Sequence, residues 1–461
     1  MASTRGTLAP MNVLLTTIGT AGDILPFIGL GIALRERGNR VTMLINEHFE
    51  SLATGNDLEF VSLGTAEEYH KALADCEEYH KSLENARFWH HFSGVEPLVQ
   101  TICGTMRSQF EVIAERHVPG CTVVVASGGA FGARIAQEKF GIPLATVVLQ
   151  PAVLRSAYIM PKVAGTPQLP GWLPPICKRF FFRCADVVLD RVFHASEVNA
   201  YRAQVGLGPV NRLLKDWWLS PQLVIALFPE WFCEPQPDWP ENLRMTGFPL
   251  YDGRANDAAL SDEATSFLGE GGPPIVFTPG SGMMHCHSFF QAGLEACQLL
   301  GVRGIFLTRY VDQLPSHLPD AIGNFDYVPL SLLLPRASAL VHPGGIGTMS
   351  QALAAGIPQL IMPLCNDQPD NAQRIRRLGV GDWIKPSAFR ANAVADKMNR
   401  LIHSSDVASR CRAVAKQIDG PNAIRRTCEL IEYLAGGKES TASERTADGR
   451  RIAGASVQAA S

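Results

Sequence analysis

The residue with the clearest catalytic potential is Asp23, which ends the glycine-rich segment Gly19-Thr-Ala-Gly-Asp23. This segment follows a strand-like apolar run at 12–18 and precedes a stretch with helical spacing over 24–37. A carboxylate in such a loop can take a proton from a hydroxyl group as a general base. It could instead only cap the following helix, a role that aspartate also fills well.

A second glycine-rich segment, His342-Pro-Gly-Gly-Ile-Gly-Thr348, also lies between a strand-like run and a helix. Its glycines let the backbone come close to a ligand. The N–H groups of Gly347, Thr348 and Met349 would form an anion site aided by the helix dipole. His342 could donate a further hydrogen bond to a phosphate oxygen. The alternative is a tight turn with a packed histidine.

Two further groups of polar or aromatic residues stand close to this segment. Asp367 and Gln368 follow the expected strand 359–362, where an acid and an amide could bind sugar hydroxyls, although Asp367 could also be a helix cap. Tyr327 and Val328 precede a short helix, where a ring and a backbone could hold a base. A single tyrosine at such a position is more often part of the core.

Two regions of alternating strands and helices must position these residues. The first has expected strands at 12–18, 40–46, 60–63, 122–127, 144–149 and 223–227. The second has expected strands at 275–278, 304–308, 325–328, 339–342 and 359–362. Alternation of this kind is typical of an α/β fold with doubly wound parallel sheets. Ligands of such sheets bind at the C-terminal ends of the strands, so two facing domains would share one cleft.

This organisation divides the chain into four expected parts. They are an N-terminal extension at 1–10, an acceptor-binding domain at 11–240, a nucleotide-sugar-binding domain at 241–435, and a disordered tail at 436–461. The tail is assigned from its small, polar composition. The last helix before it is expected to pack back on the N-terminal domain.

Composition excludes several classes of protein. The 461 residues carry 44 acidic and 41 basic side chains, a net charge of −3, whereas a dedicated nucleic-acid binder would have a basic excess. The 11 cysteines form no Cys-x-x-Cys pair, which favours reduced thiols in a cytoplasmic protein. No apolar run approaches the length of a membrane span, and the first ten residues do not resemble a secretory signal.

The stretch from Tyr327 to Asn371 resembles the nucleotide-sugar signature of glycosyltransferase family 1, whose members have the GT-B fold. Aromatic-x-Pro, His-x-Gly-Gly-x-Gly-Thr, the Gly-x-Pro at Gly356-Ile-Pro358, and Asp-Gln occur in the family's order and spacing. The resemblance covers about residues 11–434. The segment Gly19–Pro26 is also similar to the N-terminal loop of sterol and glycopeptide glucosyltransferases, which reads Gly-x-x-Gly-Asp-x-x-Pro.

The resemblance implies a role for each matching residue. Asp23 would be the general base, and Asp367 and Gln368 would bind the sugar. The nucleotide and diphosphate would contact Gly22, Gly280, Ser281, Tyr327, Val328, His342, Gly344, Gly345, Gly347 and Thr348. Because no Asp-x-Asp occurs, we expect no metal or other cofactor. The leaving diphosphate would be stabilised by His342, Ser281 and the helix N-terminus.

Other segments resemble the rhamnosyltransferases of rhamnolipid synthesis, among them Ser220-Pro-Gln, Asp238-Trp-Pro240 and Thr246-Gly-Phe-Pro249. This implies a dTDP-rhamnose donor and a hydroxyacyl-lipid acceptor. UDP-glucose with a sterol or another lipophilic alcohol is the second possibility. The reaction expected in both cases is an inverting, metal-independent hexosyl transfer from a nucleotide-diphosphate sugar.

The acceptor pocket is expected in 151–240, where aromatic residues accumulate. Its candidate lining residues are Trp172, Phe181, Trp217 and Trp218. Any single one of these is more often a core residue. The basic and aromatic run 178–183 could also rest on an anionic membrane, as a peripheral contact at its inner face.

Two other functions share this fold. A nucleotide-sugar 2-epimerase would turn over its nucleotide sugar without an acceptor, and would need acid and base carboxylates in a watery cleft. A non-catalytic partner subunit would bind the donor weakly and transfer nothing. The joint presence of Asp23, His342, Asp367 and Gln368 argues against the second.

Overall fold

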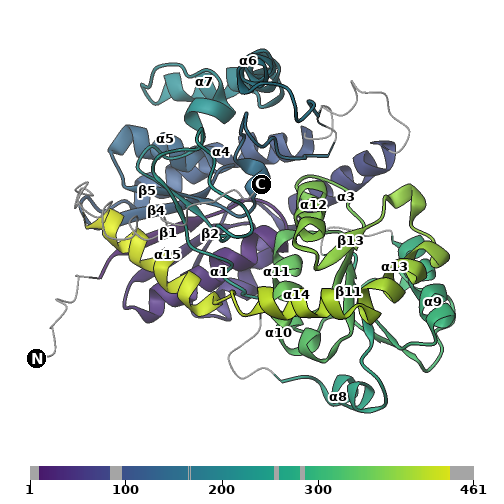
Figure 1. The fold of residues 1–461 in the computed structure, drawn as a ribbon. Helices are drawn as coiled ribbons and strands as arrows, with labels where there is room; N and C mark the ends of the chain where they lie inside the picture. Colours follow the sequence, from purple (N-terminus) through teal and green to yellow (C-terminus); the bar gives the residue numbers. More distant parts are fainter. Residues whose placement is uncertain are drawn as a thin grey trace, which may run out of the picture.

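The computed structural model describes residues 10–83, 96–164, 166, 168–253, 259–280 and 286–436. Ser281, the expected tail beyond Gly436, and all of the expected extension except Pro10 lie outside the described residues. The chain forms two α/β domains, each with a parallel sheet between helices (Figure 1). The predicted fold class of two doubly wound domains is therefore confirmed.

The N-terminal sheet has seven parallel strands in the order β3-β2-β1-β4-β5-β6-β7. They are β1 (Asn12–Thr16), β2 (Arg40–Ile45), β3 (Glu59–Ser62), β4 (Thr122–Ser127), β5 (Leu144–Val148), β6 (Leu223–Ala226) and β7 (Leu243–Met245). Side chains of β1 alternate between two cores, since Val13 and Leu15 pack on one face and Leu14 on the other. Burial on both faces explains why the strands read as continuous apolar runs.

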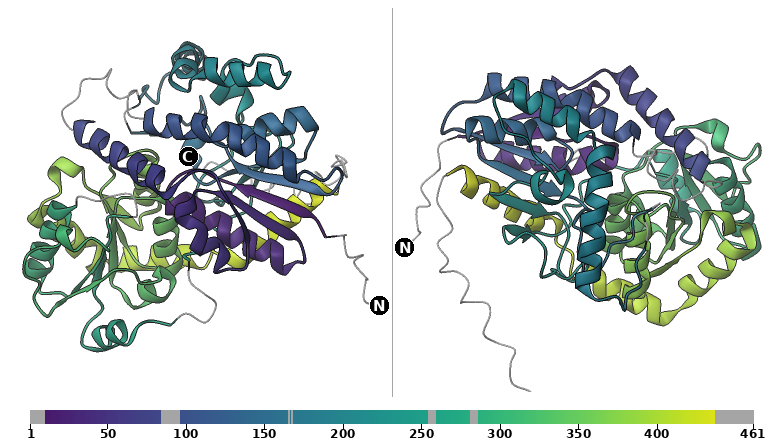
Figure 2. Two further views of the ribbon diagram at one scale, coloured as in Figure 1. Left: turned by 180° about the vertical axis from the view of Figure 1, so that it is seen from behind. Right: turned by 90° about the horizontal axis from the view of Figure 1, so that it is seen from above.

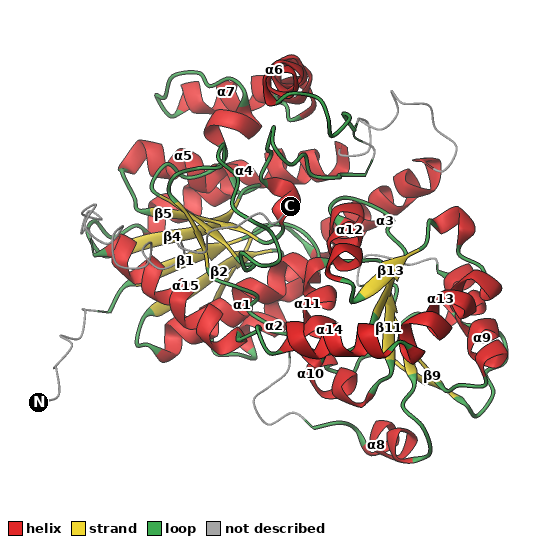
Figure 3. Cartoon of the chain, viewed as in Figure 1, coloured by secondary structure: helices red, strands yellow, loops and turns green. Residues whose placement is uncertain are grey.

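Helices cover both faces of this sheet (Figure 3). They are α1 (Ala21–Glu36), α2 (Glu50–Thr54), α3 (Ala66–Leu83), α4 (Glu96–Arg116), α5 (Phe131–Phe140), α6 (Pro175–Val192) and α7 (Ala195–Gln204). One core contains the buried side of α1, and the other contains α4 and α5. α6 and α7 lie outside α4 and α5 as a further layer (Figures 1 and 2).

The C-terminal sheet has six parallel strands in the order β10-β9-β8-β11-β12-β13. They are β8 (Ile275–Phe277), β9 (Gly304–Leu307), β10 (Ile322–Phe325), β11 (Ala339–His342), β12 (Gln359–Ile361) and β13 (Gly381–Trp383). Its helices are α8 (Asp262–Gly269), α9 (His287–Leu300), α10 (Leu330–Leu333), α11 (Ile346–Ala355), α12 (Gln368–Leu378), α13 (Ala391–His403) and α14 (Ser405–Ala415).

Three strand assignments differ from the sequence predictions. β10 ends at Phe325, where the sequence suggested that a strand begins, so Tyr327 and Val328 lie in the loop after it. β13 was not predicted. β7 joins the N-terminal sheet, which therefore extends to Met245 and past the expected boundary at residue 240.

The last helix, α15 (Gly420–Ala435), leaves the C-terminal domain and packs on α1, β4 and β5 of the N-terminal domain (Figure 1). The Arg37 guanidinium pairs with the Glu432 carboxylate at 2.5 Å. The Thr427 hydroxyl donates to Thr246 Oγ1 at 2.9 Å. These contacts tie the end of the chain to the first domain.

Both sheets reverse their strand order in the middle, between β1 and β4 and between β8 and β11. Loops at such a reversal diverge and leave a crevice at the C-terminal strand ends. Asp23 lies in the first turn of the helix after β1, Gly280 in the loop after β8, and His342 at the end of β11. Among the described residues, no helix is both long and apolar enough to span a membrane.

Candidate active site

Asp23 occupies the third position of α1, with its carboxylate folded back over the start of the helix. Thr20 is the N-cap, and its N–H donates to Asp23 Oδ2 at 2.9 Å, as in a capping box. Gly19 has φ +136°, and a Cβ there would lie 2.2 Å from Asp23 Oδ2, so only glycine fits beside the carboxylate. Burial raises the pKa of Asp23 to about 6, against the opposing effect of the Thr20 hydrogen bonds.

His342 is fully buried at the end of β11, with both ring nitrogens bonded inside the domain. The Gly344 N–H donates to Nδ1 at 3.1 Å, so Nε2 carries the hydrogen and donates to Gln359 Oε1 at 2.9 Å. Burial lowers the pKa of His342 to about 4, and the ring is neutral. In this arrangement both ring nitrogens are engaged, and His342 holds the turn in place. A hydrogen bond from His342 to a phosphate oxygen stays a prediction.

The first turn of α11 presents backbone donors next to this histidine. Gly345 is the N-cap, and the Met349 N–H already bonds to the Gly345 carbonyl at 3.0 Å. The end donors are therefore the N–H groups of Ile346, Gly347 and Thr348, one residue earlier than the sequence suggested. A Cβ on Gly345 or Gly347 would meet no atom within 4 Å, so the turn is open to a ligand.

Gly344 has to be glycine for two reasons. Its φ is +103°, and a Cβ there would lie 2.8 Å from Ile361 Cγ2. We expect Gly344→Ala to lower the free energy of unfolding by about 1–3 kcal/mol. Gly347→Ala is the matched control, because it adds the same methyl in open space on a helix and should lose no stability. Urea unfolding of both variants checks this, and equal stabilities would contradict it.

Asp367 and Gln368 begin α12, beside the His342 turn. Asn371 Nδ2 donates to Asp367 Oδ2 at 2.6 Å and to the Gly344 carbonyl at 2.9 Å, which couples the two loops. Gln368 Oε1 accepts from the N–H groups of Leu364 and Cys365 at 2.7 and 3.0 Å. The oxygen of Gln368 thus shapes the loop.

Asp367 and Asp23 lie close enough to interact across the two domains. Burial above all, with the charges of Asp23 and Asp370 as smaller causes, raises the pKa of Asp367 to about 7. Apolar residues near the two helix starts also lie by a common surface, since Ala21 of α1 and Ile346 of α11 both pack against the same N-terminal core. The first turns of α1 and α11 therefore lie near the same core, and each domain brings a carboxylate, Asp23 or Asp367, to this region.

The remaining predicted donor residues lie around this point. Gly280 follows β8 with φ +81°, and a Cβ there would be 3.9 Å from Pro343 Cγ. Gly22 is exposed in the first turn of α1. Tyr327 is half-exposed and donates its hydroxyl hydrogen to the Asp252 carbonyl, whereas Val328 is buried in the core.

The four predicted acceptor residues differ in burial and in the elements that they contact. Trp217 is buried, and its Nε1–H donates to Glu138 Oε1 at 2.6 Å, so it is a core residue. Trp172 is 81% exposed on the loop before α6. Phe181 is half-buried on α6. Trp218 packs on Gly128 at the end of β4 and is the one of the four next to the strand ends.

Sequence reasoning missed a group of side chains near Asp23. His48 stacks on Tyr69 with ring centroids 4.4 Å apart. Burial, together with His70 and then Arg309, lowers the pKa of His48. Burial, with Asp23 and Tyr310 next, raises the pKa of Tyr69 to about 12. Arg309, which follows β9 in the other domain, is near enough to lower the pKa of both His48 and Tyr69 as a smaller cause. Single residues in separate elements carry no motif that could have found them.

A segment of the N-terminal domain closes over the start of α12. The Ala164 N–H donates to the Asn366 carbonyl at 3.0 Å, and the Lys162 N–H to Asp370 Oδ1 at 3.1 Å. Asp370 also binds Arg374 Nε at 2.7 Å. The loop after β5 is thereby fixed beside the predicted sugar-binding residues.

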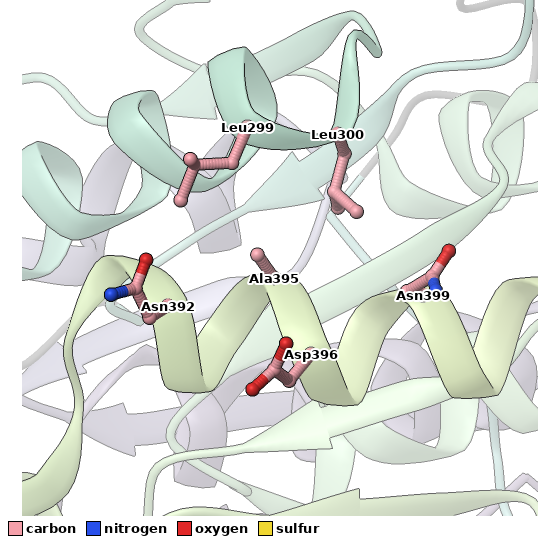
Figure 4. A pocket seen from close by; sticks show the side chains of 6 residues that line it. All are labelled: Leu299, Leu300, Asn392, Ala395, Asp396 and Asn399. Carbon is pink, nitrogen blue, oxygen red and sulfur yellow. The ribbon is translucent and has the colours of Figure 1, made fainter.

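Two other features do not involve the residues described above. A surface groove runs between α9 and α13, lined by Leu299, Leu300, Asn392, Ala395, Asp396 and Asn399 (Figure 4). Among the described residues, Cys103, His194 and Glu197 place possible metal-ligand atoms within 4.8 Å of one another. His194 there already bonds Glu197 at 3.0 Å and Glu96 at 3.2 Å. Neither feature includes a predicted site residue.

Comparisons with known proteins agree with this arrangement. Residues 13–159 match the glycosyltransferase family 28 N-terminal domain. Residues 305–429 match the C-terminal domain of the erythromycin biosynthesis protein CIII-like family. The first match contains Asp23, and the second contains the turn at His342 and Asp367.

Similar proteins align along most of the chain. O-mycaminosyltylonolide 6-deoxyallosyltransferase of Streptomyces fradiae is 26% identical over 434 residues, which cover 92% of this chain and 98% of that protein. A sterol 3-beta-glucosyltransferase of Debaryomyces hansenii is 25% identical over 92% of this chain but only 27% of its own length. The solved glycotransferase of kitacinnamycin has a TM-score of 0.71 at 18% identity, over 93% of this chain and 100% of that one. Together, the two domain matches, the relatives and the shared GT-B fold support a glycosyltransferase enzyme.

Proposed function

We propose that this chain is an inverting, metal-independent glycosyltransferase that moves a hexose from a nucleotide-diphosphate sugar to a hydroxyl group of a lipophilic acceptor. The observation that supports the proposal most directly is the packing of Ala21, in the first turn of α1, and Ile346, in the first turn of α11, against the same core. From it we infer that Asp23 of one domain lies opposite the backbone anion site of the other.

In the proposed reaction, Asp23 takes the proton from the acceptor hydroxyl as its oxygen attacks the anomeric carbon. The bond from the anomeric carbon to the phosphate oxygen breaks, and its electron pair leaves with the diphosphate. Attack on the face opposite the leaving group inverts the anomeric centre. The charge that develops on the diphosphate meets the N–H groups of Ile346, Gly347 and Thr348.

The donor is proposed to be of the dTDP-rhamnose or UDP-glucose type. A 6-deoxyhexosyltransferase and a sterol glucosyltransferase among the similar proteins support these two choices. Arg309 is the exposed side-chain cation that faces the cleft from the C-terminal domain, and we propose that it adds to diphosphate binding.

The direct test is transfer from dTDP-rhamnose or UDP-glucose to a hydroxyacyl lipid and to a sterol, with EDTA present. The anomeric configuration of the product, read by proton NMR, should be opposite to that of the donor. Retained configuration, or dependence on an added divalent cation, would contradict the mechanism. Turnover of the donor without any acceptor would instead favour an epimerase.

The pH dependence follows from the pKa of Asp23. A general base works when it is ionised, so kcat/KM should rise about tenfold per pH unit up to about pH 6 and level off above it. Asp367, with a pKa of about 7, shares the site, so a second inflection near that pH is expected. Initial rates at low acceptor concentration measure the profile. A flat rate from pH 5 to 8 would contradict a titrating base.

A further inference from the structure

The outer face of α6 carries large apolar side chains that point into solvent. Ile176, Phe180 and Val187 are 73%, 71% and 59% exposed. Their spacing of four and seven residues places them on one side of a helix with 3.6 residues per turn. Trp172, on the loop just before α6, is exposed as well. Such a row differs from the single exposed apolar residues of ordinary surfaces, and it indicates an interaction site.

The exposed charges on this same helix are all basic. Arg179 and Arg183 flank the apolar row on one side, and Arg191 continues it at the C-terminal end. Arg179 also lies over the Tyr158 ring, 5.5 Å from its centroid, and bonds its hydroxyl at 3.1 Å. Basic and aromatic groups are thus combined on one surface.

The acidic residues of α6 are turned inward and neutralised. Asp186 is buried and pairs with Arg155 at 2.7 Å and with Arg212 at 3.3 Å. The two oxygens of Asp190 accept from the N–H groups of Arg212 and Leu213 at 2.7 and 2.8 Å. The exposed Asp216 on the adjoining turn is paired with Arg212 at 3.3 Å. The outer face of α6 therefore carries a net positive charge.

This face also lies at the periphery of the molecule. α6 belongs to the layer outside α4 and α5, away from the sheet (Figures 1 and 2). Tyr158 and Ile159, 42% and 44% exposed, extend the apolar surface along the segment that leads to the contact between Ala164 and Asn366. The surface thus reaches from α6 toward the boundary between the two domains.

We propose that the outer face of α6, defined by Ile176, Phe180, Val187, Arg179 and Arg183, docks on an anionic lipid bilayer. Amphipathic helices with apolar and basic side chains lie in the bilayer interface and gain both from apolar burial and from attraction to anionic headgroups. A second copy of the chain fits less well. A symmetric contact would bring the same arginines against each other.

The test is flotation of the full chain with vesicles of phosphatidylcholine alone or with about 30% phosphatidylglycerol. We expect binding to the anionic vesicles only, weakened by high salt. Arg179→Glu with Arg183→Glu, and separately Ile176→Ser with Phe180→Ser, should each weaken binding at least about tenfold. Leu299→Ser and Arg400→Glu, exposed residues of the other domain, are the matched controls and should bind as the unchanged chain does.

Exposed thiols give a second readout on the folded protein. Cys177 and Cys184 are exposed on α6, and Cys121 is exposed before β4. Anionic vesicles should protect the first two from a maleimide, read by mass spectrometry, and leave Cys121 reactive. Absence of flotation by the unchanged chain, or equal labelling of all three thiols, would overturn the proposal. A dimer in light scattering that the α6 variants abolish without vesicles would also overturn it, in favour of a second copy.

Discussion

Replacing Asp23 by asparagine is expected to reduce kcat for glycosyl transfer by at least about a thousandfold, with little change in the affinity for the nucleoside diphosphate. The amide keeps the size of the side chain but cannot take the acceptor's proton. The diphosphate is expected to contact α11 instead, so its binding should survive. Initial-rate kinetics and calorimetry with UDP and dTDP measure the two effects separately.

The same substitution has a predicted effect on stability that separates catalysis from folding. The pKa of Asp23 is raised from 3.8 to about 6 in the folded chain, so the ionised carboxylate lowers the free energy of unfolding. This cost grows as the pH rises from about 4 to about 6 and is constant above. Asp23→Asn should therefore be no less stable than the unchanged chain at pH 7 to 8. A stable variant with strong residual transfer would remove Asp23 from the proposed role.

Glu at the same position is a second control. Asp23→Glu keeps the charge, but Gly19 leaves no room for a longer side chain against the backbone, since a Cβ there would already touch the present carboxylate. We expect an intermediate loss of activity, with the base displaced from the acceptor. Full activity in this variant would show that the capping geometry does not position the base.

The sheets and the loops of the site could be predicted because local patterns determine them. Parallel strands buried on both faces read as apolar runs, and glycine marks the turns that follow. The positions of Asp23, after β1, and of the turn at His342, after β11, could therefore be predicted from the sequence alone. Strand ends were less certain, as β10 shows, because Val328 is again a core residue although the strand ends at Phe325 and Asp326 and Tyr327 are exposed.

The role of His342 could not be predicted, because its partner lies on another strand. Gln359 begins β12, and the parallel register pairs it with Leu340, two residues before His342, on the same side of the sheet. That register places the amide at the ring's Nε2. Whether a histidine at a strand end faces a ligand or its own domain depends on such a partner, 17 residues away in the chain.

The packing of the four candidate acceptor residues could not be predicted for a related reason. Aromatic composition shows that a segment contains bulky side chains but not which way each one faces. The turn at Leu213–Trp217 folds Trp217 inward, where the guanidinium groups of Arg134 on α5 and Arg202 on α7 lie 5.7 and 5.3 Å from its ring centroid. Trp172 faces outward instead. Long-range packing decided between these outcomes, and it left only Trp218 near the strand ends.

Replacing Asp370 by alanine is expected to lower the free energy of unfolding by about 3–5 kcal/mol, because it leaves a buried arginine without its counterion. The side chains of Asp370 and Arg374 are only 8% and 10% exposed, and their atoms lie 2.7 Å apart. The Arg374 guanidinium also donates to the Phe232 carbonyl of the N-terminal domain at 3.3 Å. The lost carboxylate would further release the Lys162 N–H, and with it the loop beside the sugar-binding residues.

The chain offers a matched control in Asp406 and Arg410, which have the same spacing and a 2.9 Å contact but are 72% and 54% exposed. Asp406→Ala should cost less than about 1 kcal/mol, since solvent screens the pair. Adding Arg374→Met to Asp370→Ala should restore most of the lost stability, because it removes the unpaired charge. Urea unfolding of the three variants distinguishes these effects. Equal losses at Asp370 and Asp406 would mean that burial does not set the strength of the pair. Recovery of stability in the double variant without recovery of donor-sugar affinity would assign the Lys162 contact, separately from the ion pair, to sugar binding.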